Sequence, residues 1–252
     1  MPDYPEQLYK FQKMKEKNFA VVIPCYNEGK RLDTKTFAEF IAGHPQIKFI
    51  FVDDGSSDNT AEILTDLCSQ ERAIFLKLTK NCGKAEAVRQ GILHANKLGD
   101  FDFIGFWDAD LATGLEELQR MCNIIEDKTI YISGCRLLRL GGAIQRKQLR
   151  HLLGRGFATA VSLHLDLPVY DTQCGAKLYK AQCIKAVFEK PFVTRWFFDV
   201  EILRRLIKFY SKETVLNDSI EMPLYRWLDV DGSKLRYFHC LKDFIKLLTS
   251  KD

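Results

Sequence analysis

The apolar residues of this chain fall into short continuous runs, and longer amphipathic stretches separate these runs. A short apolar run with polar residues on both sides is typical of a buried strand, whereas apolar residues at three- and four-residue steps indicate a helix. The pattern predicts strands over residues 19–23, 48–52, 73–78, 101–111, 129–133 and 219–227. It predicts helices over residues 6–17, 34–43, 61–70, 85–98, 115–127, 143–165, 197–210 and 234–248.

Strands and helices alternate along most of the chain, which predicts the α/β class with a mostly parallel central sheet and helices on both faces. The 252 residues, 46% of them hydrophobic, suffice for one large domain or two small ones. The sequence contains no linker, repeat or low-complexity tract. We therefore expect a single domain over residues 1–252, with residues 1–18 as an N-terminal extension and residues 234–252 as a C-terminal amphipathic helix.

Residues 101–111, FDFIGFWDADL, carry two acids at the end of an apolar run. Side chains alternate along a strand, so Asp108 and Asp110 would point the same way if the strand continues through them. Ligands of open α/β sheets bind at the carboxyl ends of strands. Paired carboxylates there suit Mg²⁺ or Mn²⁺. Taken alone, the pair is either a metal site or a solvated strand end.

Two loops bear on ligand binding. The first predicted strand is not followed by G-x-G-x-x-G, the turn that binds dinucleotides in Rossmann units, so NAD and FAD are disfavoured. Gly83 and Lys84 open a predicted helix, where free amides and the helix dipole favour an anion. The alternative is a surface lysine in a first helical turn. Asn59 and Glu62 have capping-box spacing, which favours Asn59 as a structural cap.

The net charge of +4 conceals an asymmetry. Between Lys128 and Leu165 there is no acidic residue but seven Lys or Arg, among them Arg146, Lys147 and Arg150. A basic helix is often only a solvated face, but the missing acids favour an anion-binding function. No nucleic acid is expected as the anion, because the segment lacks interleaved aromatic residues for base stacking.

The eight cysteines form no C-x-x-C pair, and we expect reduced thiols. The N-terminus is polar and no stretch of about 18 uncharged apolar residues occurs, which predicts a soluble, cytoplasmic protein. In the last predicted helix, one apolar stripe contains Phe238, Leu241, Ile245 and Leu248. The stripe either packs on the domain or lies in a membrane interface, which would give peripheral contact with the inner face of a membrane.

Five motifs in order, VVIPCYNE, VDDGSSDNT, NCGKAEAVRQG, DADL and DTQCGAKLY, resemble those of the family 2 glycosyltransferases, which have the Rossmann-like GT-A fold. Within that family, the chain is most similar to the polyprenyl-phosphate sugar transferases, in particular the dolichyl-phosphate glucosyl- and mannosyltransferases. The DTQCG loop and the WLDVDGSKL stretch resemble the glucosyl type. The resemblance extends from about Phe19 to Leu235, nearly the whole chain.

The resemblance implies roles for the motif residues. Asp108 and Asp110 match the motif that binds a divalent metal, Mg²⁺ or Mn²⁺. Asp108 is also implied to contact the nucleotide-sugar donor. The nucleotide-sugar donor is implied to bind around Pro24, Tyr26, Glu28, Asp53, Gly83 and Lys84. Donor or acceptor phosphates are implied to bind at Arg136, Arg150, Ser233 and Lys234, and the acid-free segment adds Arg146.

The sequence departs from the family pattern at two places. Mannosyltransferases of the family often have Gln after DADL, whereas this chain has Ala112, so the metal would keep an additional water. Many relatives carry transmembrane helices that this sequence lacks. The second departure bears on a membrane-bound acceptor but not on transferase chemistry.

The acceptor decides which base the reaction requires. A phosphate is already an anionic nucleophile, whereas a hydroxyl acceptor needs a carboxylate base. Asp199 is the candidate base by its rough match to the acidic motif of hydroxyl-using relatives, and Asp171 is the reserve. A cation held by Asp108 and Asp110 would stabilise the charge of the leaving group. We therefore expect Asp110, Asp199 and Asp171 as catalytic residues.

The sequence predicts an inverting, metal-dependent hexosyltransferase that uses a nucleotide sugar, UDP-glucose in preference to GDP-mannose, and a polyprenyl-phosphate acceptor. A transferase to a saccharide or protein hydroxyl is the first alternative. A catalytically idle nucleotide-sugar-binding protein is the more distant one. Glycoside hydrolysis is disfavoured because the acids cluster at a metal motif and not as a separated acid/base pair. The oligomeric state is left open.

Overall fold

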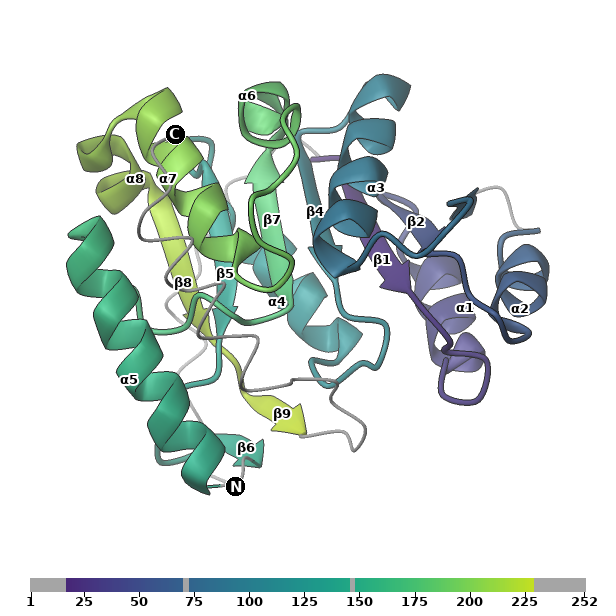
Figure 1. The fold of residues 1–252 in the computed structure, drawn as a ribbon, viewed down its shortest axis with the longest axis horizontal. Coiled ribbons are helices and arrows are strands. Elements are labelled where there is room, and N and C mark those ends of the chain that lie inside the picture. Colours follow the sequence, from purple (N-terminus) through teal and green to yellow (C-terminus); the bar gives the residue numbers. More distant parts are fainter. Residues whose placement is uncertain (1–16, 70–72, 146–147, 229–252) are drawn as a thin grey trace.

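A computed structural model describes residues 17–69, 73–145 and 148–228 of the chain, and its centre is a seven-stranded sheet of order β3-β2-β1-β4-β7-β5-β8 (Figure 1). Strand β7 runs antiparallel to its neighbours β4 and β5, and the other pairs are parallel. The mostly parallel sheet is therefore confirmed. Its strands are β1 (Phe19–Cys25), β2 (Ile47–Asp53), β3 (Ala73–Lys77), β4 (Phe103–Trp107), β5 (Tyr131–Cys135), β7 (Ala176–Lys180) and β8 (Ser219–Pro223).

Helices cover both faces of this sheet, as expected (Figure 1). One face carries α3 (Lys84–Leu98), α5 (Gln148–Leu165), α6 (Ile184–Phe188) after a 3₁₀ turn (Ala181–Cys183), α7 (Phe198–Tyr210) and α8 (Lys212–Asp218). The other face carries α1 (Thr34–Gly43), α2 (Thr60–Leu67) and α4 (Leu115–Ile124).

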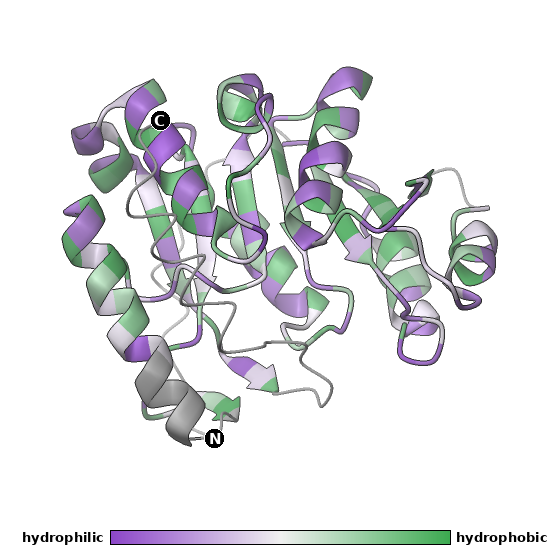
Figure 2. Ribbon diagram, in the orientation of Figure 1, coloured by the Kyte–Doolittle hydropathy of each residue, from purple (hydrophilic) through white to green (hydrophobic). Residues whose placement is uncertain are grey.

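The two covered faces explain the continuous apolar runs. In β1, Ala20 and Val22 are buried in one core, and Val21 and Ile23 are buried in the other. Because side chains alternate along a strand, burial on both faces requires an apolar residue at every position. Figure 2 shows the hydrophobic residues concentrated in the central strands and on the helix sides that face them.

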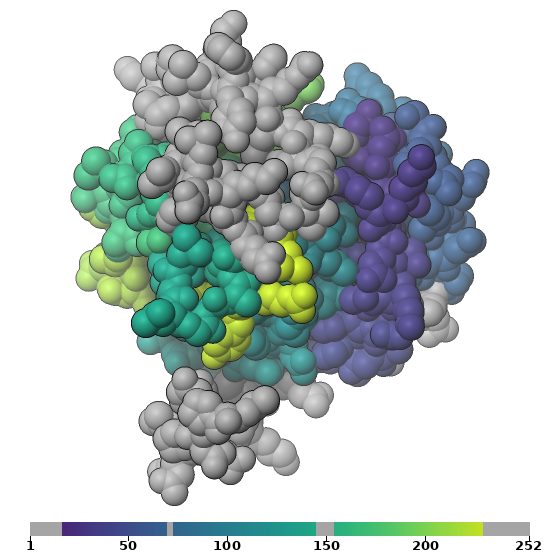
Figure 3. Space-filling model, turned by 90° about the horizontal axis from the view of Figure 1, so that it is seen from below, coloured from purple at the N-terminus to yellow at the C-terminus, as the bar shows by residue number. Residues whose placement is uncertain are grey.

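The strand ends bring the polar motifs to one edge of the sheet. Cys25 of β1 is level with Asp53 of β2, and Trp107 of β4 is level with Ala176, the first residue of β7. Because β7 is antiparallel, its beginning lies where β1, β2 and β4 end. Seen from that edge, the surface joins segments far apart in sequence: purple N-terminal residues, teal residues that follow β5, and the yellow segment around β9 (Figure 3).

Two predicted elements are wrong because a second, small sheet interrupts them. The predicted helix 143–165 begins only at Gln148, since Ala143–Gln145 forms β6 and pairs in parallel with β9 (Arg226–Leu228). The predicted strand 219–227 is likewise divided into β8 and β9. The chain leaves the large sheet where the buried Glu117 carboxylate accepts the Tyr225 amide at 2.7 Å and the Arg226 amide at 3.3 Å.

Three local details differ from or agree with the pattern. Pro24 lies inside β1, although the predicted strand ended before it. Strand β4 pairs with β1 only as far as Val22, so a residue without an amide N–H is tolerated at position 24. Asn59 occupies the N-cap position of α2, but its side chain makes no capping hydrogen bond. Asp33 does cap α1, accepting the Thr36 amide at 3.0 Å.

The described residues test the predictions for the cysteines and for one more strand, but not those for the two terminal helices. Seven cysteines lie in these ranges and all are free thiols, as expected. The predicted helices over residues 6–17 and 234–248 lie outside the described residues. The predicted strand 129–133 exists but is displaced by two residues, to Tyr131–Cys135.

Candidate active site

The two acids of DADL lie in a turn at the end of β4. The strand stops at Trp107, the amide of Leu111 reaches back to the Asp108 carbonyl at 3.4 Å, and Leu111 has φ +50°. The Ala112 amide donates to Asp110 Oδ1 at 3.1 Å. The expectation of an extended strand through both acids is therefore wrong. The two carboxylates nevertheless lie close enough to interact, since the Asp108 charge adds to burial in raising the pKa of Asp110.

A lysine from a neighbouring helix compensates this negative charge. Lys84, the first residue of α3, places its Nζ 2.5 Å from Asp108 Oδ1, and each side chain is 33% exposed. Burial would lower the pKa of Lys84, but the Asp108 carboxylate outweighs this effect and holds that pKa above its usual value. Residues 24 positions apart in the sequence thus form one charged centre that is open to solvent.

Gly175 of the DTQCG loop lies directly against this centre. The Asp108 amide donates to the Gly175 carbonyl at 2.9 Å, and a Cβ at Gly175 would lie 1.9 Å from Asp108 Oδ2. A side chain at position 175 would therefore force the Asp108 carboxylate or the loop to shift, which favours glycine here. The motif residue that sequence reasoning left without a role therefore shapes the space around Asp108.

Asp54 holds the loop that delivers Lys84. Its carboxylate accepts the Cys82 amide at 2.7 Å and the Gly83 amide at 2.8 Å, while its own amide donates to the Cys25 carbonyl at 2.8 Å. Gly83 has φ +91°, a conformation that favours glycine. Two amides that precede α3 are thus occupied by Asp54, so an anion at this site would depend on the Lys84 side chain. Its position directly after β2 was the available signal for Asp54.

The residues expected to bind the nucleoside lie at the ends of β1 and β2. Asp53 is fully buried; its Oδ1 accepts the Ser56 amide at 2.9 Å, and its Oδ2 has no hydrogen-bond partner among the described residues. Glu28 pairs with Arg31 at 2.7 Å. Pro24 and Tyr26 flank Cys25 at the same edge. The structure therefore brings Pro24, Tyr26, Glu28 and Asp53, four of the residues expected to bind the nucleotide sugar, to one region. There the buried Oδ2 of Asp53 can accept a hydrogen bond.

The candidate base Asp199 lies in a buried ion pair. Lys177, only 1% exposed in the middle of the sheet, donates to Asp199 Oδ1 at 2.7 Å and to the Cys174 carbonyl at 2.5 Å. Burial raises the pKa of Asp199, and Lys177 opposes that rise. Asp199 also interacts electrostatically with Lys84 and Asp108, so it belongs to the same charged centre. A lysine inside a buried strand requires such a partner. The sequence pattern did not predict the strand Ala176–Lys180, so it gave no signal for Lys177.

The reserve base Asp171 is bound to Arg136. The guanidinium Nε and Nη2 of Arg136 donate to the two Asp171 oxygens at 2.6 and 2.8 Å, and both side chains are buried. Burial alone would raise the pKa of Asp171, but Arg136 outweighs it and holds that pKa well below its usual range. Asp171 is thus a very weak base.

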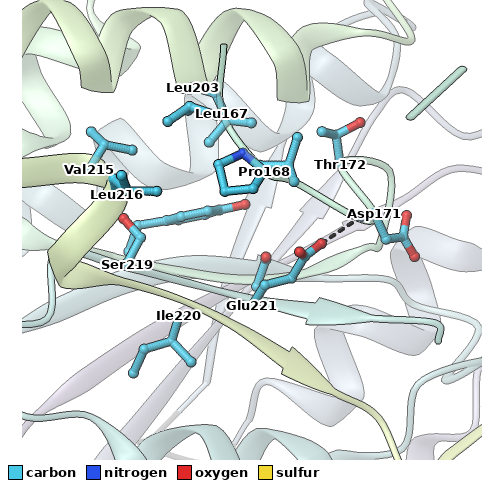
Figure 4. Close-up of a pocket in the computed structure, with 13 residues that line it drawn as sticks. Leu167, Pro168, Asp171, Thr172, Leu203, Val215, Leu216, Ser219, Ile220 and Glu221 are labelled. Carbon is cyan, nitrogen blue, oxygen red and sulfur yellow. Dashed lines mark hydrogen bonds between the residues drawn. The ribbon is translucent and has the colours of Figure 1, made fainter. Parts of the chain in front are cut away.

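A largely apolar cavity lies behind the Asp171 loop, between β8, α7 and α8 (Figure 4). Leu167, Pro168 and Leu203 form part of its wall, and the Asp171 amide donates to Glu221 Oε1 at 2.5 Å at its polar end. Asp108 and Asp110 do not line it. The cavity is therefore a space apart from the charged centre.

Comparison with known proteins decides the family. Residues 20–188 match the family model described as "Glycosyl transferase family 2". The chain belongs to glycosyl transferase family 2. This range contains every described motif residue discussed above except Asp199.

Three curated proteins similar to this glycosyltransferase are named for the same activity. A dolichyl-phosphate beta-glucosyltransferase of Trichomonas vaginalis is 32% identical over 90% of this chain and 68% of its own length. That of Saccharomyces cerevisiae is 32% identical over 86% of this chain and 68% of its own, and that of Homo sapiens is 31% identical over 87% and 70%. This chain is accordingly a glycosyltransferase rather than an idle binding protein.

Solved structures agree on the fold. The glucosyl-3-phosphoglycerate synthase of Mycobacterium tuberculosis, in complex with phosphoglyceric acid, superposes with a TM-score of 0.61 at 16% identity and covers 92% of this chain and 79% of its own. Its complex with Mn²⁺, UDP-glucose and phosphoglyceric acid also gives a TM-score of 0.61, at 15% identity. The GT-A fold of this glycosyltransferase is thereby confirmed.

None of its described helices is long and apolar enough to cross a membrane.

Two carboxylates of this glycosyltransferase, those of Asp108 and Asp110, fit a divalent cation. The described ranges contain no cluster of three or more His, Cys, Asp or Glu that would enclose a metal. They do contain two neighbouring carboxylates, and the ammonium of Lys84 contacts one of them. Carboxylate oxygens with open positions for water and phosphate suit Mg²⁺ and Mn²⁺.

The structure does not describe the side chains of several residues that are expected to bind phosphate. Arg146, Ser233 and Lys234 lie outside the described residues, and of Arg150 the structure describes only its place in α5. Farther along that helix, the Arg155 guanidinium lies 3.5 Å from the Tyr170 ring centroid and donates to the Tyr170 carbonyl at 2.9 Å. This cation of the acid-free segment therefore fixes the loop that leads to Asp171.

Proposed function

We propose that this glycosyltransferase transfers glucose from UDP-glucose to a polyprenyl phosphate with inversion at the anomeric carbon. The names of the similar curated proteins, dolichyl-phosphate beta-glucosyltransferases, support the sugar and the acceptor. The structural neighbours in complex with UDP-glucose and Mn²⁺ support the donor and a divalent metal.

The ion pairs of the two candidate bases, Asp199 and Asp171, favour a phosphate as the acceptor. Asp199 is paired with Lys177 and Asp171 is paired with Arg136, and both pairs are buried. Arg136 makes Asp171 a very weak base, whereas Asp199 keeps a raised pKa but is buried with one carboxylate oxygen bound to Lys177. Neither acid is therefore well suited to deprotonate a hydroxyl. A phosphate acceptor needs no such base, because it reaches the sugar already as an anion.

The residues of the charged centre have distinct roles in this proposal. Asp108 and Asp110 would hold the divalent cation, whose positive charge stabilises the departing diphosphate. Lys84 adds a second positive charge for the phosphates beside it. Asp53 orients the nucleoside through its free buried oxygen, and Gly175 leaves room next to Asp108. Binding the nucleotide sugar in one orientation lowers the activation free energy, because the entropy of bringing the reactants together is lost before the reaction.

A hydroxyl acceptor is the second candidate, and one observation favours it. Burial raises the pKa of Asp199, which makes this carboxylate more basic than an exposed aspartate, and Asp199 interacts with Lys84 and Asp108. In that reaction Asp199 would take the hydroxyl proton as the nucleophile attacks.

A transfer assay tests the proposal. The full chain is incubated in detergent with Mn²⁺, labelled sugar nucleotide and polyprenyl phosphate, and the lipid product is analysed by chromatography and NMR. We expect β-linked glucosyl phosphate lipid from UDP-glucose, less product from GDP-mannose, and none from the unphosphorylated polyprenol. Transfer to the free polyprenol or to a saccharide, with none to the phosphate, would favour the hydroxyl acceptor instead.

A further inference from the structure

The ammonium of Lys84 contacts Asp108, a carboxylate that would hold the divalent cation. Its Nζ is 2.5 Å from Asp108 Oδ1, which is a direct contact through an oxygen expected to bind metal. Both side chains are one-third exposed, so a solvated ion can reach the pair. Lys84 is the first residue of α3, and Asp54 anchors the loop before it, so the contact is built into the fold.

Lys84 and a divalent cation cannot both bind the Asp108 carboxylate strongly. Two positive groups on one carboxylate lie only a few ångströms apart, and like charges at such distances repel strongly in a partly buried site. Binding of the metal therefore requires Lys84 to leave Asp108 or to weaken its contact.

Lys84 has other negative partners within reach. Asp199 and Asp110 both interact electrostatically with it. The Phe106 ring, 5.8 Å from Lys84 Nζ, also lies 5.3 Å from Lys177 Nζ, which holds Asp199. A displaced ammonium thus stays inside an acidic surrounding beside the metal site. An incoming diphosphate offers it a stronger partner than either carboxylate, since the two phosphoryl groups together carry more negative charge than one carboxylate.

We propose that Lys84 takes the place of the divalent cation on Asp108 in the metal-free enzyme and moves to the donor's phosphates when the metal binds. The inference rests on the proposed metal role of Asp108 and Asp110. It makes metal alone a weak ligand, because the metal must displace an internal cation. It also makes metal and nucleotide bind cooperatively, because the phosphates receive the lysine that the metal releases.

Binding of Mn²⁺ alone tests this proposal without any turnover. Free Mn²⁺ is measured by electron paramagnetic resonance during titration of the full chain, with no nucleotide present. We expect Lys84→Met to bind Mn²⁺ about tenfold more tightly than the wild type, because the competing charge is gone. Lys84→Arg, which keeps the charge, should bind Mn²⁺ as weakly as the wild type. Lys77→Met, which removes an exposed lysine at the end of β3, is the control for net charge and should also match the wild type.

A second titration follows the nucleotide. In saturating Mn²⁺, UDP should bind Lys84→Met about tenfold more weakly than the wild type, because the phosphates lose the lysine that the metal releases. Circular dichroism verifies that each variant is folded.

The outcomes separate the inference from the function. If Lys84→Met binds Mn²⁺ no more tightly than the wild type while Asp110→Asn abolishes binding, the metal site stands and the exchange is wrong. If Asp110→Asn binds Mn²⁺ as well as the wild type, or if no protein binds it, the proposed metal site and the exchange both fail.

Discussion

Gly175 and Asp108 are in contact so close that a Cβ at position 175 would lie 1.9 Å from the Asp108 carboxylate. Gly175→Ala must therefore displace either the carboxylate or the DTQCG loop. We expect a loss of about 1–3 kcal/mol in the free energy of unfolding and weaker Mn²⁺–UDP binding by calorimetry. Gly156→Ala is the matched control: nothing lies within 4 Å of a Cβ there. In α5 it should stabilise the protein by about 0.5–1 kcal/mol. Unchanged binding in Gly175→Ala would contradict the role of the glycine.

Asp110→Asn should separate catalysis from stability. Removal of a principal charge-stabilising group should lower the transfer rate by at least about 10²-fold. The variant should be as stable as the wild type or more stable at neutral pH. Burial and Asp108 raise the pKa of Asp110, so its ionised form disfavours the folded state once the pH exceeds the unfolded-state pKa, and asparagine removes this penalty. Assays with and without EDTA and thermal unfolding at pH 7 measure both effects. Full activity in the variant would remove Asp110 from the metal site.

The Arg136–Asp171 pair should make stability depend on pH. Because the pKa of Asp171 is lower in the folded state, its contribution is fully present above about pH 4, the unfolded-state value, and is lost as the pH falls toward the folded-state pKa. At pH 7, Asp171→Asn leaves a buried guanidinium unpaired and should cost about 3–5 kcal/mol. Urea denaturation from pH 7 to pH 2 should show this difference shrinking below pH 4.

A matched aspartate serves as the control for that experiment. Asp166 has φ +50°, which asparagine tolerates, and its side chain is 86% exposed. Asp166→Asn should therefore stay near the wild-type stability across the pH range. A constant difference between Asp171→Asn and the wild type at all pH values would show that the pair is not the source of the effect.

Asp199→Asn distinguishes the two acceptors. With a polyprenyl phosphate, transfer should persist within about tenfold of the wild-type rate, because a general base, worth about 10²–10⁴-fold, is not needed. The variant should still lose stability, since Lys177 becomes an unpaired buried cation. The double variant Lys177→Met, Asp199→Asn should recover part of that stability. A loss of 10³-fold or more at full folding would assign Asp199 as the base.

Membrane contact remains a prediction from the sequence. We expect salt-sensitive binding to anionic vesicles, since each nearby cation contributes about 1 kcal/mol. Truncation after Leu235, or replacement of Arg146, Lys147 and Arg150 by alanine, should weaken it. Sedimentation with anionic and neutral vesicles at low and high salt measures the effect. The absence of binding even at low salt would leave the C-terminal apolar stripe to pack on the domain.

Much of the site could be predicted because its residues are marked by local patterns. Asp53 and Asp108 follow apolar runs, and a run buried on both faces must stop where the chain reaches the edge of the sheet. Gly83 and Lys84 precede a helix with clear periodicity. These signals span a few residues each, which is the range over which strand and helix periods act.

The sequence by itself determined the α/β class, the family resemblance and the acids at the strand ends, because side-chain alternation and helical periodicity are properties of consecutive residues. Only the tertiary structure decided which charges meet: Lys84 with Asp108, Lys177 with Asp199, and Arg136 with Asp171. It also decided that Ala143–Gln145 is a strand, since its partner β9 begins at Arg226. Such contacts depend on how distant segments are brought together at the sheet edge, and no period along the chain records that arrangement.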